Sequence, residues 1–172
     1  MATAETLFAA YHDRLLRYLS RCAGQADRGR DLTQEVFLRV SRTAIPVAAD
    51  GQLAAWLFRI ARNVALDHHR RQQRQPEAAV SIERAKPATQ DMSLALNQAL
   101  TLLPDLDRDV FLMREVGGLS YGEISTACEL TPDAVRSRIH RARLALQQTL
   151  SEPLARRQST PMRLSGKRTS HE

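Results

Sequence analysis

Cysteine is scarce in this chain, and neither a long apolar run nor a secretory leader is visible. Cys22 and Cys128 are the only cysteines among 172 residues, which excludes a disulfide-stapled scaffold. No apolar stretch approaches the length of about 20 residues that a membrane-spanning helix needs. The first residues, MATAETLFAAYHDR, are acidic and amphipathic, whereas a secretory signal starts basic and continues apolar. These absences together predict a cytoplasmic protein.

Motifs that commonly carry enzymatic chemistry are also missing. The chain has no glycine-rich phosphate loop and no nucleophile elbow. His68 and His69 are adjacent, so on a helix they point about 100° apart and cannot bind one metal ion as an i, i+4 pair would. We therefore expect no catalytic activity, no small-molecule substrate, no cofactor and no metal site.

Arginine, by contrast, is abundant. The net charge is +6, and Lys86 and Lys167 are the only lysines. Such a charge favours an anionic partner, either nucleic acid or an acidic membrane surface. The planar guanidinium group suits phosphates and guanine edges better than an ammonium group does. Hydrophobic residues make up 43% of the chain, which is enough for a packed core.

The stretch LSYGEISTACELTPDAVRSRIHRARLAL, residues 119–146, predicts two short helices around a tight turn. Ser120 and Glu123 have the spacing of a capping box, and Thr131 followed by Pro132 is typical of a second helix start. An arginine-rich helix after a tight turn is typical of a helix-turn-helix that enters the DNA major groove. A helical hairpin with an ordinary solvated basic face is the alternative.

The outer side of this second helix is expected to face DNA. Arg136 and Arg141 are the best candidates for bidentate contacts to guanine or for phosphate contacts, and Arg138 lies toward the flank, where phosphate is the expected partner. The residues expected on the DNA-facing side are Arg136, Ser137, His140, Arg141 and Arg143.

A second basic face lies on the predicted helix 52–73, whose apolar stripe assigns Trp56 to the core. Its opposite side suits phosphate contacts and stacking on exposed bases, with a solvated basic face as the alternative. The residues on this side are Arg59, Arg62, Asn63, Arg70, Arg71 and Arg74, with His68 and His69 nearby.

The segment DLTQEVFLRV, residues 31–40, is acidic instead. Asp31, Gln34 and Glu35 are expected to point outward while the apolar residues between them point inward. DNA would repel such a face, so it suits a basic protein partner. A solvated helix start with acids in its first turn is the alternative.

Helical periodicity dominates the chain, and no convincing alternating strand is visible. The segment 74–91 is polar and contains Pro76 and Pro87, which indicates a flexible linker. We therefore predict an all-α chain of two small helical domains, residues 1–73 and 92–150, joined by the linker 74–91. The basic tail 151–172 is expected to be disordered.

Taken in order, DLTQEVFLRV, WLFRIARNVALDHHRR, LPDLDRDVFLMREVGGLSYGEIS and TPDAVRSRIHRAR resemble bacterial sigma factors of the sigma-70 family. The small size matches the extracytoplasmic-function class, which retains the second and fourth sigma domains. The resemblance covers about residues 5–150. It implies a dissociable promoter-specificity subunit of RNA polymerase and not an enzyme.

The resemblance also implies roles for the three surfaces. Asp31, Gln34 and Glu35 would bind the clamp helices of the largest catalytic subunit of core RNA polymerase. The helix 52–73 would melt and hold the minus-ten promoter element through Arg59, Arg62, Asn63, Arg70 and Arg71. The last helix would read the minus-thirty-five element through Arg136, Ser137, His140, Arg141 and Arg143.

Three further expectations follow from the resemblance. An anti-sigma factor, often membrane-anchored, would hold the protein inactive, so sequestration at the inner membrane is implied. The loop 43–51 would capture a flipped base of the minus-ten element. Many family members have Gly or Asn in the helix-turn-helix turn, so Glu129 there would cost about 1 kcal/mol if its backbone is left-handed.

Two other classes of protein remain open at this point. One is a DNA-binding regulator that never joins polymerase, and the other is a pure protein-interaction adaptor. The DLTQEVF segment argues against the first, because an ordinary repressor has no need of it. The second basic helix argues against the adaptor.

Overall fold

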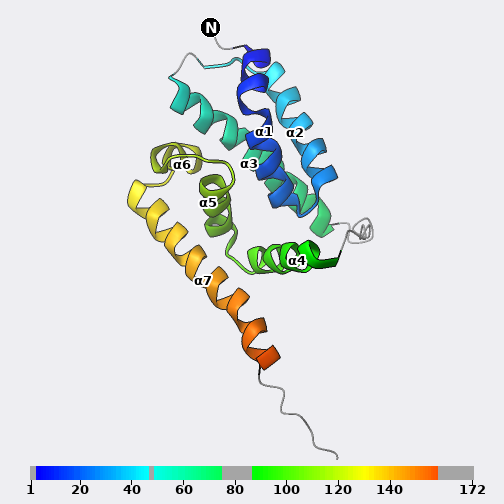
Figure 1. Ribbon diagram of the computed structural model, residues 1–172. Coiled ribbons are helices and arrows are strands. Elements are labelled where there is room, and N and C mark those ends of the chain that lie inside the picture. The colour runs from blue at the N-terminus through cyan, green and yellow to red at the C-terminus, as the bar shows by residue number, and fades with distance from the viewer. Residues whose placement is uncertain (1–2, 47–48, 75–86, 159–172) are drawn as a thin grey trace, which may run out of the picture.

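The computed structural model describes residues 3–46, 49–74 and 87–158. Over these residues the chain forms seven α-helices and no strand, which confirms the all-α prediction for the described part (Figure 1). The helices are α1 (Ala4–Ala23), α2 (Ala26–Ser41), α3 (Asp50–Arg74), α4 (Pro87–Thr101), α5 (Asp105–Glu115), α6 (Tyr121–Cys128) and α7 (Pro132–Gln158).

Helices α1 and α2 form a tight antiparallel pair. α1 starts at the N-cap Thr3, which forms a capping box with Thr6, and ends at Gly24 with φ of 70°. Near the turn the two backbones touch: a Cβ atom added at Gly29 would lie 2.6 Å from the Cα of Ser20. Only glycine permits this crossing, because real Cβ atoms need a longer separation.

Helix α3 lies across this pair and closes the N-terminal core. Tyr18 of α1 and Phe58 of α3 are fully buried, and their ring centroids are 5.4 Å apart at an interplanar angle of 57°. Trp56 is half-buried and packs against the core from its rim. The core is therefore centred on Phe58, which the apolar stripe did not single out, rather than on Trp56.

The helix-turn-helix forms with the predicted caps. The Ser120 backbone N–H donates to Glu123 Oε2 at 2.6 Å, and the Glu123 N–H donates to Ser120 Oγ at 3.2 Å. Thr131 Oγ1 accepts from the N–H of Ala134 at 3.2 Å. Glu129 ends α6 in the left-handed conformation, with φ of 56°. The capping predictions are thus confirmed, and Glu129 has the left-handed backbone on which the expected cost of about 1 kcal/mol depends.

Several helix boundaries differ from the sequence expectation. α3 spans Asp50–Arg74 rather than 52–73, so it includes the last two residues of the predicted loop 43–51. α4 begins at Pro87, inside the segment predicted to be linker, because proline is well tolerated at the first position of a helix. α7 continues to Gln158, past the predicted start of the tail. The rest of the predicted linker, 75–86, and of the tail, 159–172, lies outside the described residues.

The N-terminal and C-terminal halves pack against each other, with α5 and α6 beside α1 and α3 (Figure 1). The turn after α5 approaches Phe58 so closely that a Cβ atom at Gly117 would lie 2.7 Å from its ring. Arg14 of α1 donates from Nε to the carbonyl oxygen of Gly117 at 2.9 Å and from Nη2 to that of Gly118 at 3.2 Å. One continuous apolar cluster therefore runs through both halves.

Candidate nucleic-acid interface

The buried inner face of α7 determines which of its side chains stay exposed. Val135, Ile139 and Ala142 are buried at helical spacing and hold α7 against α5 and α6. This docking fixes which side of the helix meets solvent. The side chains that it leaves exposed include all five of the predicted DNA-facing residues: Arg136, Ser137, His140, Arg141 and Arg143.

Two of these exposed arginines already have protein partners at the surface. Arg136 Nη1 donates to Asp133 Oδ1 at 3.0 Å, one turn earlier on α7. Its guanidinium carbon also lies 5.9 Å from the centroid of the Tyr121 ring. Arg143 donates to the carboxylate of Glu115 on α5. Both carboxylates are accessible to water, so these pairs hold the arginines weakly.

A third carboxylate, that of Asp107 on α5, is buried beneath α7. Arg138 Nη1 donates to its Oδ1 at 2.6 Å, while Arg141 donates from Nε to Oδ2 at 3.2 Å and from Nη2 to Oδ1 at 3.4 Å. Burial alone would raise the pKa of Asp107, but the hydrogen bonds from Arg141 and Arg138 outweigh it and lower that pKa. Arg138 is mostly buried in this contact.

Part of the basic face of α3 lies in the contact with the C-terminal half, and the rest faces solvent. Arg62 Nε donates to Asp109 Oδ2 of α5 at 2.7 Å. Arg59 Nη2 donates to the carbonyl oxygen of Thr126 at 2.7 Å, and its Nη1 lies 3.4 Å from Glu129 Oε1. Arg59 and Arg62 therefore face the C-terminal half. Of the other residues predicted on this side of the helix, His68 and His69 are half-buried, and the exposed ones are Asn63, Arg70, Arg71 and Arg74.

The Arg62–Asp109 pair is the most enclosed ionic contact between the two halves. Burial raises the pKa of Asp109, and the guanidinium of Arg62 opposes that rise. For Arg62, burial would lower the pKa, but the Asp109 carboxylate raises it more. Sequence patterns could not reveal this pair, because its partners are 47 residues apart and each looks like an ordinary surface charge.

A small cavity of about 340 Å³ lies where the loop after α2 meets α3. The half-buried Trp56 forms part of its wall, and the exposed Asn63 lies on its rim. The cavity adjoins the beginning of the predicted base-capturing loop 43–51, of which residues 47–48 are outside the described part. Its lining residues are Arg39, Arg42, Thr43, Trp56, Ile60 and Asn63.

The predicted acidic face of α2 is only partly free. Asp31 and Gln34 are exposed, whereas Glu35 is half-buried. Glu35 accepts a hydrogen bond from Arg39 Nη2 at 2.7 Å and lies 3.6 Å from Arg71 of α3. Glu35 thus ties α2 to the end of α3 as well as facing outward.

An apolar groove of about 570 Å³ lies between α1 and α2 beside Gln34. Phe8 and Leu38 are large apolar side chains that stay about half exposed at this groove. The ring of Phe37 is tilted against that of Phe8, with centroids 4.8 Å apart. The sequence patterns that defined the candidate surfaces were patterns of charge, so they did not indicate this apolar surface. The adjacent apolar pair Phe37-Leu38 was a usable signal, because both cannot face the core from one helix.

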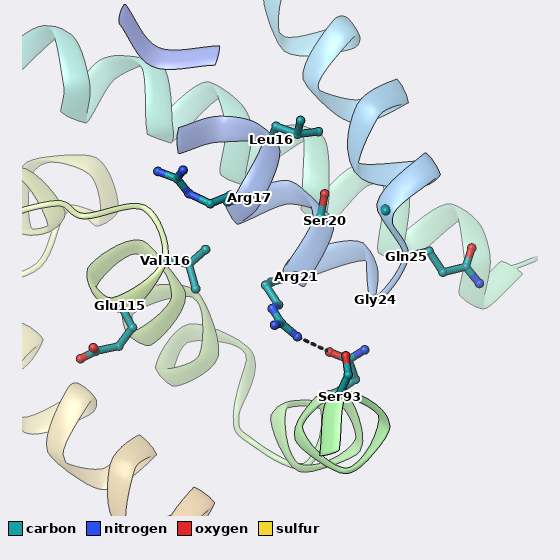
Figure 2. Close-up of a pocket in the computed structure, with 11 residues that line it drawn as sticks. Leu16, Arg17, Ser20, Arg21, Gly24, Gln25, Ser93, Glu115 and Val116 are labelled. Atoms are coloured by element: carbon teal, nitrogen blue, oxygen red, sulfur yellow. Dashed lines mark hydrogen bonds between the residues drawn. The ribbon is translucent and has the colours of Figure 1, made fainter. Parts of the chain in front are cut away.

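A second cleft, of about 530 Å³, lies where α1, α4 and α5 approach one another (Figure 2). Arg17 and Arg21 of α1 border it opposite Glu115 at the end of α5 and the following residue, Val116. Arg21 donates to Asn97 of α4 at 3.4 Å. The two halves are thus in close contact beside α3, whereas this cleft separates them where α1 faces α4 and α5. Across the described residues we find neither a cluster of metal-ligating side chains nor a helix long and apolar enough to cross a membrane.

This arrangement defines a class of protein: a two-part, all-helical DNA-binding factor with a helix-turn-helix in its C-terminal half. Comparison with family models narrows the class. The model described as Sigma-70 region 2 matches residues 7–75, and that described as Sigma-70, region 4 matches residues 93–146. The chain belongs to the sigma-70 family of RNA polymerase sigma factors, within the extracytoplasmic-function class. It is a promoter-specific transcription initiation factor.

Individual relatives agree with this assignment. The chain is 31% identical over 170 residues to the RNA polymerase sigma-H factor of Pseudomonas aeruginosa, a match that covers 88% of each protein. It is also 31% identical over 163 residues to the ECF RNA polymerase sigma factor SigE of Mycolicibacterium smegmatis, covering 88% of this chain and 63% of that protein.

A solved structure shares the fold. The sigma factor RpoE of Bartonella quintana, crystallised in complex with the anti-sigma factor NepR, superposes with a TM-score of 0.67 at 24% identity. The match covers 86% of this chain and 96% of that one.

Proposed function

We propose that α7 reads the minus-thirty-five element of the promoter from the major groove. One observation carries this proposal: docking through a buried stripe leaves all five predicted contact residues exposed on one helix. Arg136 and Arg141 contact base edges, and the flanking side chains contact phosphate. These five residues are Arg136, Ser137, His140, Arg141 and Arg143.

The N-terminal half, residues 1–73, recognises the minus-ten element through α3. Asn63, Arg70 and Arg71 are exposed and suit an unpaired strand, and the cavity beside Trp56 could receive one extruded base. Arg59 and Arg62 join them once the C-terminal half, residues 92–150, has moved away. The segment 74–91 connects the two domains in this proposal.

Core RNA polymerase binds at the outer face of α2, and its clamp helices are the proposed contact. Asp31 and Gln34 offer polar groups there, Glu35 adds charge, and the exposed apolar side chains of Phe8 and Leu38 lie beside them. A surface that combines exposed apolar groups with charge fits a protein partner better than it fits DNA.

An anti-sigma factor is the proposed regulator, and the complex of RpoE with NepR supports a partner of this kind. The protein would act in the cytoplasm, with sequestration at the inner membrane if that regulator is membrane-anchored. Catalysis and small-molecule substrates have no part in the proposal. The basic segment 151–172 is assigned no role.

Run-off transcription with purified core RNA polymerase tests this function. A template with both promoter elements should give a transcript that depends on the protein, and charge reversal at Asp31 with Gln34→Ala should weaken core binding. The double variant should leave binding of the isolated protein to upstream promoter DNA intact. DNA binding without any affinity for core polymerase would contradict the proposal and favour a regulator that acts alone.

A further inference from the structure

The contact between Asp107 and Arg141 uses one particular edge of the guanidinium group. An arginine side chain has a side edge, formed by Nε–H and one Nη2–H, and an end edge, formed by Nη1–H and the other Nη2–H. Asp107 accepts from Nε at 3.2 Å and from Nη2 at 3.4 Å, so it occupies the side edge. No protein group is recorded on the end edge within the described part of the chain.

The carboxylate that makes this contact is itself fixed. The Asp107 side chain is only 6% exposed, and Arg138, one turn earlier on α7, holds its Oδ1 at 2.6 Å. Arg141, in contrast, remains more than half exposed. The buried, immobilised carboxylate of Asp107 therefore binds the inner edge of the Arg141 guanidinium group, and the outer part of that group faces solvent.

We propose that Asp107 is a positioning residue, which holds Arg141 by its side edge so that the end edge is presented to a guanine of the upstream promoter element. The inference rests on the proposed function of α7. Guanine is the base chosen because it offers two acceptors, O6 and N7, in the major groove, and a two-donor edge pairs with both at once. Adenine offers only N7 beside a donor, which would face the donors of Arg141.

Prior positioning matters because a free arginine side chain samples many rotamers. A guanidinium group already fixed in orientation loses less conformational freedom when it binds a base, and it resists the reorientation that a wrong base would require. Asp107 consequently acts on discrimination between bases, whereas the charge of Arg141 acts on affinity for any DNA.

Arg136 supplies the matched comparison on the same helix. Its partner Asp133 accepts one hydrogen bond, and the Asp133 side chain is 89% exposed. A solvated carboxylate with one contact cannot fix a guanidinium plane as a buried one with two contacts does. Asp133→Asn is therefore the control for Asp107→Asn, because both remove one carboxylate charge beside one DNA-facing arginine.

The experiment measures binding of holoenzyme to promoters that carry each of the four bases at each upstream position. Wild-type holoenzyme should prefer guanine at one position, and Arg141→Ala should abolish that preference. Asp107→Asn should reduce the same preference by about tenfold while Asp133→Asn leaves it unchanged. The double variant with Asp107→Asn and Arg141→Ala should lose no more than Arg141→Ala alone, because the two residues act through one contact.

The outcomes distinguish failure of this inference from failure of the proposed function of α7. If Arg141→Ala abolishes a guanine preference that Asp107→Asn leaves intact, the inference is wrong and α7 still reads the element. If Arg141→Ala changes affinity equally for all sequences, base reading by Arg141 is wrong. Should Asp107→Asn fail to fold, Asp107→Glu keeps the charge but moves the carboxylate by one methylene. It should also lower the preference, and an unchanged preference there overturns the inference.

Discussion

At the scale of single residues, Glu129 sits in a backbone conformation that few residues adopt. Its φ of 56° lies in the left-handed region, where a Cβ atom crowds the following carbonyl group. Its carboxylate lies 3.4 Å from Arg59, but the Glu129 side chain is largely exposed, so this pair contributes little. The turn thus tolerates a strained residue at the end of α6.

Replacing Glu129 by glycine should therefore stabilise the protein by about 0.5–1 kcal/mol, after the larger entropy of the unfolded glycine chain is subtracted. Gly24 provides the reciprocal control, since its φ is 70° and a Cβ atom added there would meet nothing within 4 Å. Gly24→Ala should destabilise by about 1 kcal/mol. Urea unfolding measures both changes, and a destabilised Glu129→Gly protein would contradict the assignment of strain.

His68 should make the free energy of unfolding depend on pH. Its Nε2 is buried and has no hydrogen-bond partner, and its pKa is lowered by burial and by the positive charges of Arg28 and Arg71, against the opposing carboxylate of Glu35. The unfolded chain therefore binds more protons than the folded one once the pH falls below the ordinary value of 6.5. Stability should be full above that value and be lost as the pH falls through the lowered pKa.

The measurement is the free energy of unfolding at about pH 7.5 and about pH 5.5. His68→Gln should reduce the difference between the two values, because glutamine has no charge to gain. His140→Gln, on the exposed face of α7, should keep the wild-type difference. A wild-type difference that survives in His68→Gln would assign the effect to another group.

At the scale of helices, the crossing of α1 over α2 depends on the missing side chain of Gly29. A methyl group there would lie 2.1 Å from Ser20 Oγ and 2.7 Å from the Ser20 backbone nitrogen. Thr33, one turn later on α2, is buried, and its hydroxyl donates to the Gly29 carbonyl oxygen at 2.7 Å.

Gly29→Ala should destabilise the protein by about 1–3 kcal/mol through overpacking, although alanine favours helices. Gly122 in α6 is the matched control, because a Cβ atom there meets nothing within 4 Å. Gly122→Ala should stabilise by about 0.5–1 kcal/mol. Thermal unfolding of both variants gives the comparison. If both substitutions changed stability in the same direction, α1 and α2 would be able to move apart enough to accommodate the methyl group at residue 29.

Local signals allowed the helices and their caps to be predicted, because a cap involves residues three apart. Ser120 with Glu123 and Thr131 with Ala134 are examples. Long-range packing could not be predicted in this way. Phe58 is central because the turn at Gly117 presses on it, and Arg62 is enclosed because Asp109 meets it across the domain contact. Both depend on residues far away in the sequence.

At the scale of the whole molecule, the contact between the halves engages two of the arginines that we propose bind the minus-ten element. Arg62 cannot hold the Asp109 carboxylate and a DNA phosphate with the same Nε–H. Arg59 is likewise committed to the carbonyl of Thr126. The two halves must therefore separate before α3 can use its full basic face.

Asp109→Ala should favour the separated form, because it leaves the Arg62 guanidinium partly enclosed without its partner, a loss of about 3 kcal/mol. Small-angle scattering should show a larger radius, and the isolated protein should bind an unpaired minus-ten strand more tightly. Asp105→Ala is the control, since its carboxylate pairs with Arg108 on the same helix. A radius and affinity equal to wild type would show that other contacts hold the halves together.

The internal pairing of the DNA-facing arginines also affects how promoter binding responds to ionic strength. An arginine that meets a phosphate directly from water displaces condensed counterions, and log K then falls with log salt by about 0.9 for each phosphate neutralised. Arg143, one of the flanking residues proposed to contact phosphate, already pairs with the Glu115 carboxylate, which offsets part of its charge. Binding measured against salt should therefore have a shallower slope than the number of contacting arginines implies, and Glu115→Gln should steepen it. Promoter choice by this factor would then tolerate swings in intracellular salt that weaken other arginine-rich DNA binders.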